Sequence, residues 1–126
     1  MLLDIDHFKS LNDRYGHPFG DQVLKRLGAV LNGLVYDTDF VARYGGEEFV
    51  IILPRAESAG ALRKAEAIRA AVEAETFAIG FEELRATISI GLAHYPRDAS
   101  TAEELVARAD AAMYAAKSAG RNRVID

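Results

Sequence analysis

The chain contains no cysteine among its 126 residues, which excludes disulfide bonds and thiolate metal sites. No apolar run is long enough to span a membrane, and Asp4 and Asp6 interrupt the start before it can form a signal peptide. Basic residues do not dominate: 15 lysines and arginines face 19 aspartates and glutamates, for a net charge of −4. We therefore expect a cytoplasmic chain without nucleic-acid or membrane contacts, although its parent protein could be membrane-anchored.

Familiar nucleotide-binding and hydrolytic motifs are also absent. The sequence has no G-x-x-x-x-G-K-[ST] loop and no G-x-G-x-x-G after a strand. Its three histidines, His7, His17 and His94, lie far apart and are interpreted as structural or surface residues. If a nucleotide binds, other groups must hold its phosphates.

The sequence contains short alternating segments that predict an α+β domain. Half of the residues are hydrophobic, which is enough for a core. Strands are predicted at 1–5, 40–44, 49–53, 87–92 and 123–125, and helices at 7–15, from 20–21 to 34, from 58 to 72, and from 101 to a stop at Gly120. This order favours a mainly antiparallel sheet flanked by helices, close to a ferredoxin-like or polymerase-palm layout.

Three local details of these elements are specific enough to test. Ser58 is expected to cap the helix that it begins. The run Thr101-Ala102-Glu103-Glu104 is typical of a capping box at the start of the last helix. The segment 87–92 alternates with period two and is expected to form the long arm of a second hairpin.

The most informative stretch is Gly45-Gly46-Glu47-Glu48-Phe49, which joins two predicted strands. A Gly-Gly pair indicates a hairpin because glycine adopts positive φ without penalty, and it leaves room for a large ligand beside the backbone. A cation would relieve the repulsion between the two adjacent acids. The same residues, taken alone, also fit a solvated hairpin tip.

The first strand ends in acids that can complete a metal site. If it lies beside the hairpin, Asp4 and Glu47 can share an ion such as magnesium, which also binds substrate phosphates. Lys117 and Arg121, at the end of the last helix, would then contact terminal phosphates. Alternatively, these two basic residues only complement the helix dipole.

Asn12 and Asp21 flank a turn that contains Gly16, Pro18 and Gly20. An amide and a carboxylate facing one pocket suit guanine, whose paired N1–H and N2–H₂ donors adenine lacks. The alternative makes Asn12 a helix-end residue and Asp21 a helix N-cap.

Taken together, these motifs resemble the GGDEF-domain diguanylate cyclases. The resemblance covers essentially the whole chain and predicts one domain over residues 1–126. The matching segments, in the order of the family, are Asp4-Ile5-Asp6-His7-Phe8-Lys9, Asn12-Asp13, Gly16-His17, Gly20-Asp21, Arg43-Tyr44-Gly45-Gly46-Glu47-Glu48-Phe49, Ser89-Ile90-Gly91, Ala109-Asp110, Ala112-Met113-Tyr114, Lys117 and Gly120-Arg121-Asn122.

The resemblance implies that two GTP molecules are condensed into cyclic di-GMP and two pyrophosphates, with Mg²⁺ or Mn²⁺ as cofactor. Asp4, Glu47 and the Ile5 carbonyl would be metal ligands, and Glu48 would assist catalysis there. Glu47 in place of the namesake aspartate is an accepted variant. Six further positions would bind GTP: Asn12 and Asp21 through guanine, Phe8 and Lys9 through backbone N–H groups to phosphates, and Lys117 and Arg121 through the terminal phosphates.

Two features depart from the family pattern. Tyr36 stands where family members often carry the arginine of an Arg-x-x-Asp product-inhibition site, whereas Asp39 is retained. Because tyrosine cannot make a bidentate charged contact with phosphate, inhibition through this degenerate site is expected to be weak. The chain also begins inside the expected first catalytic strand, without the family's preceding helix and Asp-x-Leu-Thr-Gly turn.

The expected partners follow from this interpretation. Each domain resembles a half-site for one GTP, so two copies must face each other, as a weak homodimer, and a sensor domain is expected outside this chain. The alternative function is a catalytically impaired GTP-binding regulatory or dimerisation module. The acids and bases of the predicted site favour the enzyme, the missing segment favours the module, and Tyr36 disfavours a cyclic di-GMP receptor.

Overall fold

The computed structural model describes residues 1–126 and has the predicted α+β architecture, with a five-stranded sheet and a separate two-stranded ribbon. The strands are β1 (Leu2–Ile5), β2 (Phe40–Arg43), β3 (Glu48–Ile52), β4 (Phe77–Ile79), β5 (Glu82–Leu84), β6 (Ile88–Gly91) and β7 (Arg123–Ile125). The helices are α1 (Phe8–Tyr15), α2 (His17–Leu34), α3 (Ser58–Ala74) and α4 (Ala102–Ser118). None of them is both long and apolar enough to cross a lipid bilayer.

The strands of the main sheet lie in the order β2-β3-β1-β6-β7. Strand β1 pairs antiparallel with β3 and β6, and β2 with β3, whereas β7 pairs parallel with β6. The sheet is therefore mainly antiparallel, and the predicted edge strand at 123–125 is confirmed. The register places Asp4 of the central strand opposite Glu48 on one side and Ser89 on the other.

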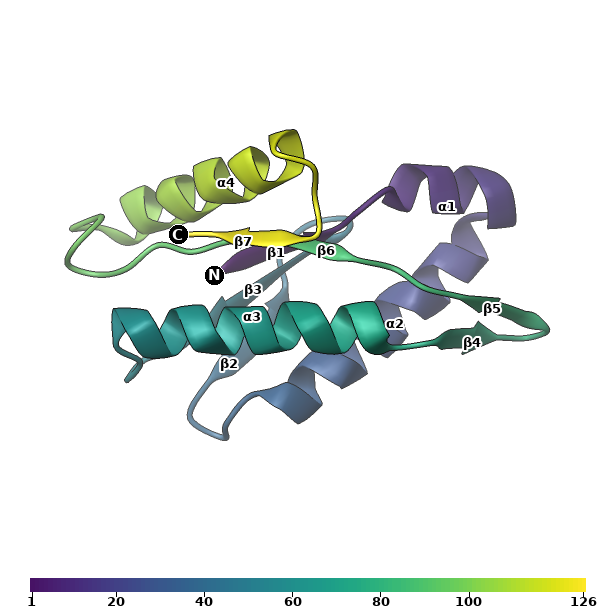
Figure 1. Ribbon diagram of the computed structural model, residues 1–126, viewed down its shortest axis with the longest axis horizontal. Helices are drawn as coiled ribbons and strands as arrows, with labels where there is room; N and C mark the ends of the chain where they lie inside the picture. Colours follow the sequence, from purple (N-terminus) through teal and green to yellow (C-terminus); the bar gives the residue numbers. More distant parts are fainter.

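Helices cover the sheet from both sides (Figure 1). Helix α4 packs on β1, β6 and β7, while α3 packs on β6 and β7 and α2 reaches β2. Alternate residues of β1 serve the two layers: Leu3 and Ile5 join the larger core, and Leu2 packs with Ala109 and Met113 of α4. Because Asp4 has the same parity as Leu2, its carboxylate emerges on the α4 side of the sheet.

The predicted second hairpin is wrong in one respect. The hairpin in this region consists of β4 and β5, which form the separate ribbon that projects beyond the main sheet (Figure 1). The segment expected to be its long arm is β6, which pairs instead with β1 and β7 inside the main sheet. All four β6 residues are buried, because helices cover both faces of this strand.

Two details of the helix starts differ from expectation: the first residue of α2 and the capping role of Ser58 in α3. Helix α2 begins at His17 rather than near Gly20-Asp21, because Pro18 is tolerated in a first turn where its missing N–H has no intrahelical partner. Ser58 opens α3 but makes no capping hydrogen bond. The N-cap of α4 is confirmed: the Glu104 backbone N–H donates to Thr101 Oγ1 at 3.2 Å.

Candidate active site

Three carboxylates, here called the acidic cluster (Asp4, Glu47 and Glu48), meet where β1 runs past the β2–β3 turn. Asp4 is 7% exposed and lies directly opposite Glu48 in the ladder. The side chains of Asp4 and Glu47 lie close enough for each carboxyl group to shift the pKa of the other. The structure thus brings together the two acids that were predicted to meet.

The electrostatics of this cluster disfavour three negative charges. Burial raises the pKa of Asp4, and this effect outweighs the opposing contact with Lys117. Burial, followed by the charge of Asp4, raises the pKa of both Glu47 and Glu48. Asp110 of α4, which the motif analysis had given no role, adds to the shift at Glu48. Glu47 is half-buried although the glycines before it are exposed, and a cation is the natural complement of this group of acids.

Lys117 lies against the acidic cluster. Its Nζ donates to Asp4 Oδ1 at 3.1 Å and to the Ile5 carbonyl oxygen at 3.5 Å. A positively charged group therefore contacts two of the oxygen-bearing positions predicted to bind the metal. Carboxylate and carbonyl oxygens are the donors that Mg²⁺ and Mn²⁺ take in proteins, so the donor set fits such an ion.

The β2–β3 turn is built differently from the expected positive-φ hairpin. The Tyr44 N–H donates to the Glu48 carbonyl at 2.8 Å, so Gly45, Gly46 and Glu47 form the loop. Neither glycine has positive φ, and this part of the prediction is wrong. A Cβ on Gly45 would lie 3.1 Å from Glu48 Oε2, whereas a Cβ on Gly46 would face open space. Arg43, which sequence reasoning missed, secures the turn by donating to the Gly46 carbonyl at 2.6 Å.

Asn12 and Asp21 lie on adjoining helices, α1 and α2. These helices approach closely at Gly20, where any Cβ would collide with the Asn12 amide. Asn12 Oδ1 is buried and has no hydrogen-bond partner. Asp21 is exposed within α2, whose N-cap is Gly16, so the N-cap alternative for Asp21 is wrong. A buried amide oxygen without a partner is a position where a ligand donor is expected.

The start of α1 presents backbone donors. His7, in the left-handed conformation with φ 58°, is the N-cap and makes no side-chain capping bond, and the first turn contains no acid. The first backbone N–H groups of α1 lack intrahelical acceptors and therefore suit an anion. The Phe8 side chain is 4% exposed and belongs to the core, so Phe8 offers only its backbone.

Arg121 follows α4 in the left-handed conformation, with φ 65°. Its Nε is buried without a hydrogen-bond partner, and no ion pair joins its guanidinium to the acidic cluster. The structure therefore places Lys117, but not Arg121, in direct contact with these acids.

A second region surrounds Tyr36 and Asp39, between α2 and β2, where a cavity of about 600 Å³ opens. Lys64 Nζ lies 3.9 Å above the Tyr36 ring, and Asp39 Oδ2 accepts the Tyr36 backbone N–H at 2.9 Å. Arg55 and Arg63 also line this cavity. Only positions 36 and 39 were predicted to belong to this region; Arg55, Arg63 and Lys64 were missed because they lie farther along the chain.

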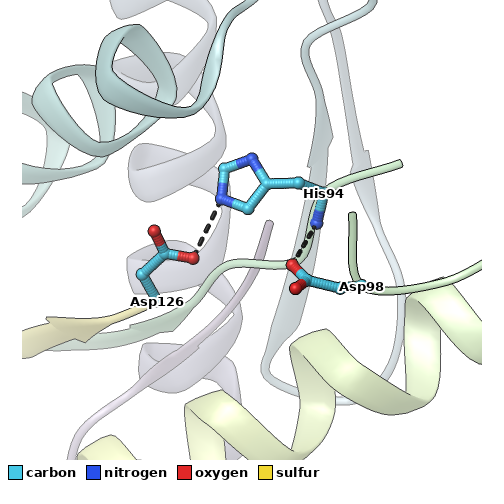
Figure 2. A group of neighbouring side chains, drawn as sticks. All are labelled: His94, Asp98 and Asp126. Atoms are coloured by element: carbon cyan, nitrogen blue, oxygen red, sulfur yellow. Dashed lines mark hydrogen bonds and ion pairs between the residues drawn. The ribbon is translucent and has the colours of Figure 1, made fainter. Parts of the chain in front are cut away.

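A third polar group, here called the C-terminal network (His94, Arg97, Asp98 and Asp126), lies at the opposite end of β6. Figure 2 shows the His94 ring directed at Asp126, to which its Nε2 lies at 2.9 Å, and Asp98 accepting the His94 backbone N–H. Arg97 donates to Asp98 at 3.0 Å and to Asp126 at 2.6 Å. An arginine thus neutralises the acids that would otherwise offer a metal site beside His94.

Comparison with known proteins agrees with this geometry. Residues 1–123 match the family model described as "Diguanylate cyclase, GGDEF domain". The chain is 46% identical over 127 residues to the response regulator PleD of Caulobacter vibrioides, covering 99% of this chain and 28% of PleD. It is 41% identical over 124 residues to diguanylate cyclase A of Treponema denticola, covering 98% of this chain and 33% of the relative.

The fold agrees with a solved structure as well. The GGDEF domain of DgcB from Caulobacter crescentus, in complex with c-di-GMP, superposes with a TM-score of 0.89 at 39% identity, covering 98% of this chain and 74% of that one. The chain spans about a third of the length of the curated relatives it matches. On sequence and fold together, this chain belongs to the GGDEF-domain family of diguanylate cyclases.

Proposed function

We propose that this chain is a catalytic domain that condenses two GTP molecules into cyclic di-GMP and releases two pyrophosphates. The observation that carries the proposal is the acidic cluster, in which burial raises the pKa of all three acids and neighbouring like charges add to each shift, beside a single lysine. Carboxylates held together in this way suit a cation and the phosphates that it carries.

Asp4, Glu47 and the Ile5 carbonyl would hold Mg²⁺ or Mn²⁺, with Glu48 assisting beside them. The support is that the Lys117 ammonium already contacts Asp4 Oδ1 and the Ile5 carbonyl oxygen. When bound, the ion lowers the pKa of the attacking 3′-hydroxyl and neutralises charge at the α-phosphate. The chain's own contribution is to hold the Asp4 and Ile5 oxygen atoms on the central strand β1, beside the Glu47 carboxylate of the β2–β3 loop and Glu48 of the adjoining strand β3.

The remaining predicted residues would bind the rest of GTP. Asn12 Oδ1 and the Asp21 carboxylate would accept from guanine, and this is supported by the buried Asn12 oxygen that has no partner. The backbone N–H groups of Phe8 and Lys9 would receive phosphate at the uncapped start of α1. Lys117 and Arg121 would bind the terminal phosphates, Lys117 by turning from Asp4 on its flexible stem.

One chain supplies one set of these groups, so the reaction requires two copies of the domain facing each other across two GTP molecules. We infer a cytoplasmic site of action, since GTP is a cytoplasmic nucleotide, and a sensor domain elsewhere in the parent protein. We also infer weak product inhibition, because Tyr36 cannot pair bidentately with phosphate. Titration of cyclic di-GMP into the active protein tests this, and potent inhibition that survives Asp39→Ala would show a different inhibitory site.

Turnover of GTP tests the proposed function directly. The chain is incubated with GTP and Mg²⁺ at high protein concentration, and cyclic di-GMP and pyrophosphate are quantified, with ATP as the control nucleotide. One cyclic di-GMP for every two pyrophosphates, from GTP only, is the expected result. GTP binding without product would favour the alternative, a regulatory or dimerisation module, and no preference for GTP over ATP would contradict both.

A further inference from the structure

Asp6 is a buried acid for which the proposed chemistry has no role. It is 6% exposed and lies two residues beyond Asp4, at the end of the central strand. Its Oδ1 accepts from Ser89 Oγ and its Oδ2 from Thr87 Oγ1, both at 2.6 Å. Two short hydroxyl bonds fix the orientation of the carboxylate, since each oxygen is held from the β6 side.

The same carboxylate reaches the segment that follows α4. The Asn122 backbone N–H donates to Asp6 Oδ2 at 3.0 Å. Three consecutive residues here have positive φ: Gly120 at 120°, Arg121 at 65° and Asn122 at 45°. For Arg121 this conformation is unfavourable unless the surroundings hold it, whereas asparagine adopts it more readily. Asp6 is one such restraint, and the bond from Arg69 Nη1 to Asn122 Oδ1 at 2.9 Å is another.

Asp6 also lies close to Lys117, which is predicted to bind the terminal phosphates of GTP. Lys117 Nζ lies 3.6 Å from Asp6 Oδ1 and 3.1 Å from Asp4 Oδ1. The Lys117 ammonium is therefore held between two carboxylates of β1, only one of which is a predicted metal ligand. Through one carboxylate, Asp6 contacts the lysine directly and fixes the turn that carries the arginine.

We propose that Asp6 is a positioning residue for the phosphate-binding pair Lys117 and Arg121. It holds the left-handed turn at 120–122 in place through Asn122 and keeps Lys117 beside the acidic cluster, from which the lysine turns to the terminal phosphates when GTP binds. This inference rests on the proposed function, because it assigns Lys117 and Arg121 to the terminal phosphates. Asp6 itself does not touch the nucleotide.

A purely structural role for Asp6 makes a different prediction. If its bonds to Thr87, Ser89 and Asn122 served only stability, loss of the carboxylate would lower the melting temperature and weaken the binding of every nucleotide to the same extent. If Asp6 is a positioning residue, its loss weakens the binding only of ligands that carry terminal phosphates. The ratio of the dissociation constants for a triphosphate and a monophosphate separates the two roles.

The experiment measures equilibrium binding of guanosine 5′-[α,β-methylene]triphosphate and of GMP, both with Mg²⁺, to the wild-type chain, Asp6→Ala, Asp6→Asn and a control. Asp98→Asn is the matched control, since Asp98 also accepts a backbone N–H, from His94 at 2.8 Å, in the distant C-terminal network. Asp6→Ala should raise the dissociation constant for the triphosphate about tenfold or more, as expected for lost bonds to charged groups, and change that for GMP less than about twofold.

Asp6→Asn keeps one carbonyl oxygen for the Asn122 N–H but loses the charge that attracts Lys117, so an intermediate shift confined to the triphosphate is expected. If Asp6→Ala does not fold, Asp6→Asn and the isosteric Thr87→Val, which removes one hydroxyl bond, decide the matter by the same ratio. Equal loss for both ligands, or none in folded variants, would overturn the positioning role. The wild-type chain is also titrated with adenosine 5′-[α,β-methylene]triphosphate, and binding as tight as that of the guanosine analogue would instead contradict the proposed function.

Discussion

The acidic cluster and the C-terminal network contain similar residues and lie at opposite ends of β6, yet their electrostatics are opposite. In the acidic cluster, burial and like charges raise the pKa of Asp4, Glu47 and Glu48. In the C-terminal network, the Arg97 guanidinium lowers the pKa of Asp98, and the acids in turn raise the pKa of Arg97.

This contrast separates a structural arrangement of acids from one suited to function. Where acids serve the fold, an arginine lies between them and each carboxylate has a donor. Where acids are held together with one lysine, their repulsion is retained at some cost to stability, as is common at catalytic sites. Proximity of acidic residues is thus a weaker criterion for a cation site than the direction of their pKa shifts.

The largest expected effect is on the rate of catalysis, and it should follow removal of one charge from the acidic cluster but not from the C-terminal network. Glu47→Gln should lower the rate of cyclic di-GMP formation by about a thousandfold or more, because it removes the proposed charged ligand of the metal ion while keeping the size of the side chain. The matched change Asp98→Asn should leave the rate near that of the wild type. Both rates are measured by product quantification, and near-normal turnover of Glu47→Gln would refute the assignment.

Asp21→Ala tests whether the predicted base site at Asn12 and Asp21 selects guanine. Loss of an acceptor for the N1–H and N2–H₂ donors should weaken GTP binding by about 1.5–3 kcal/mol, or roughly 10- to 100-fold, and leave weak ATP binding unchanged. Competition binding with both nucleotides measures this. Equal loss for the two nucleotides, or no loss, would remove Asp21 from the base site.

Assembly sets the next largest effect. If each chain provides half of a site, specific activity below the dimer dissociation constant should fall about in proportion to protein concentration, by mass action. Joining a dimerising coiled coil to the chain should restore it by raising the effective concentration. A dilution series with the oligomeric state measured at each point checks this, and constant specific activity in a monomer would contradict the two-copy mechanism.

The smallest effect is on stability, and its sign should differ between the two regions. Because the folded pKa of Glu47 is raised above its usual 4.5, its charge destabilises the fold as pH rises through the folded value. Glu47→Gln should therefore raise the melting temperature by a few degrees near pH 7, with the gain shrinking as the pH falls toward 4.

The pKa of Asp98 is lowered below its usual 3.8, so its stabilisation is present above that pH and is lost as the pH falls through the folded value. Asp98→Asn should accordingly lower the melting temperature at neutral pH, and the difference should vanish in strong acid. Thermal unfolding across the pH range measures both variants. Shifts of the same sign in both would break the contrast between the two regions.

Local patterns predicted much of the fold. The Thr101 cap, the β2–β3 hairpin and the edge strand β7 follow from residues close in sequence, and all three are present. The place of β6 in the sheet could not be predicted in this way, since it depends on which distant strand it pairs with. The start of α2 at His17 was missed because a proline was taken as a break rather than as a first-turn residue.

Residues of the candidate site that belong to recognisable motifs could be predicted from the sequence. Residues that reach the site only through tertiary packing could not. Asp4 and Glu47 were expected to meet only if β1 paired beside the hairpin, and the antiparallel β1–β3 register provides that pairing. Arg43, Asp110 and Asp6 act through contacts that form only after folding. No periodicity or spacing in the sequence marks such residues.

Binding of Mn²⁺ tests most directly the claim that the acidic cluster, and not the C-terminal network, is the cation site. Electron paramagnetic resonance measures free Mn²⁺ during titration of the wild-type chain, Glu47→Gln and Asp98→Asn, each with guanosine 5′-[α,β-methylene]triphosphate. We expect the wild type and Asp98→Asn to remove Mn²⁺ from solution beyond what the nucleotide alone binds, and Glu47→Gln to lose this excess. Excess binding that survives in Glu47→Gln but disappears in Asp98→Asn would contradict the account.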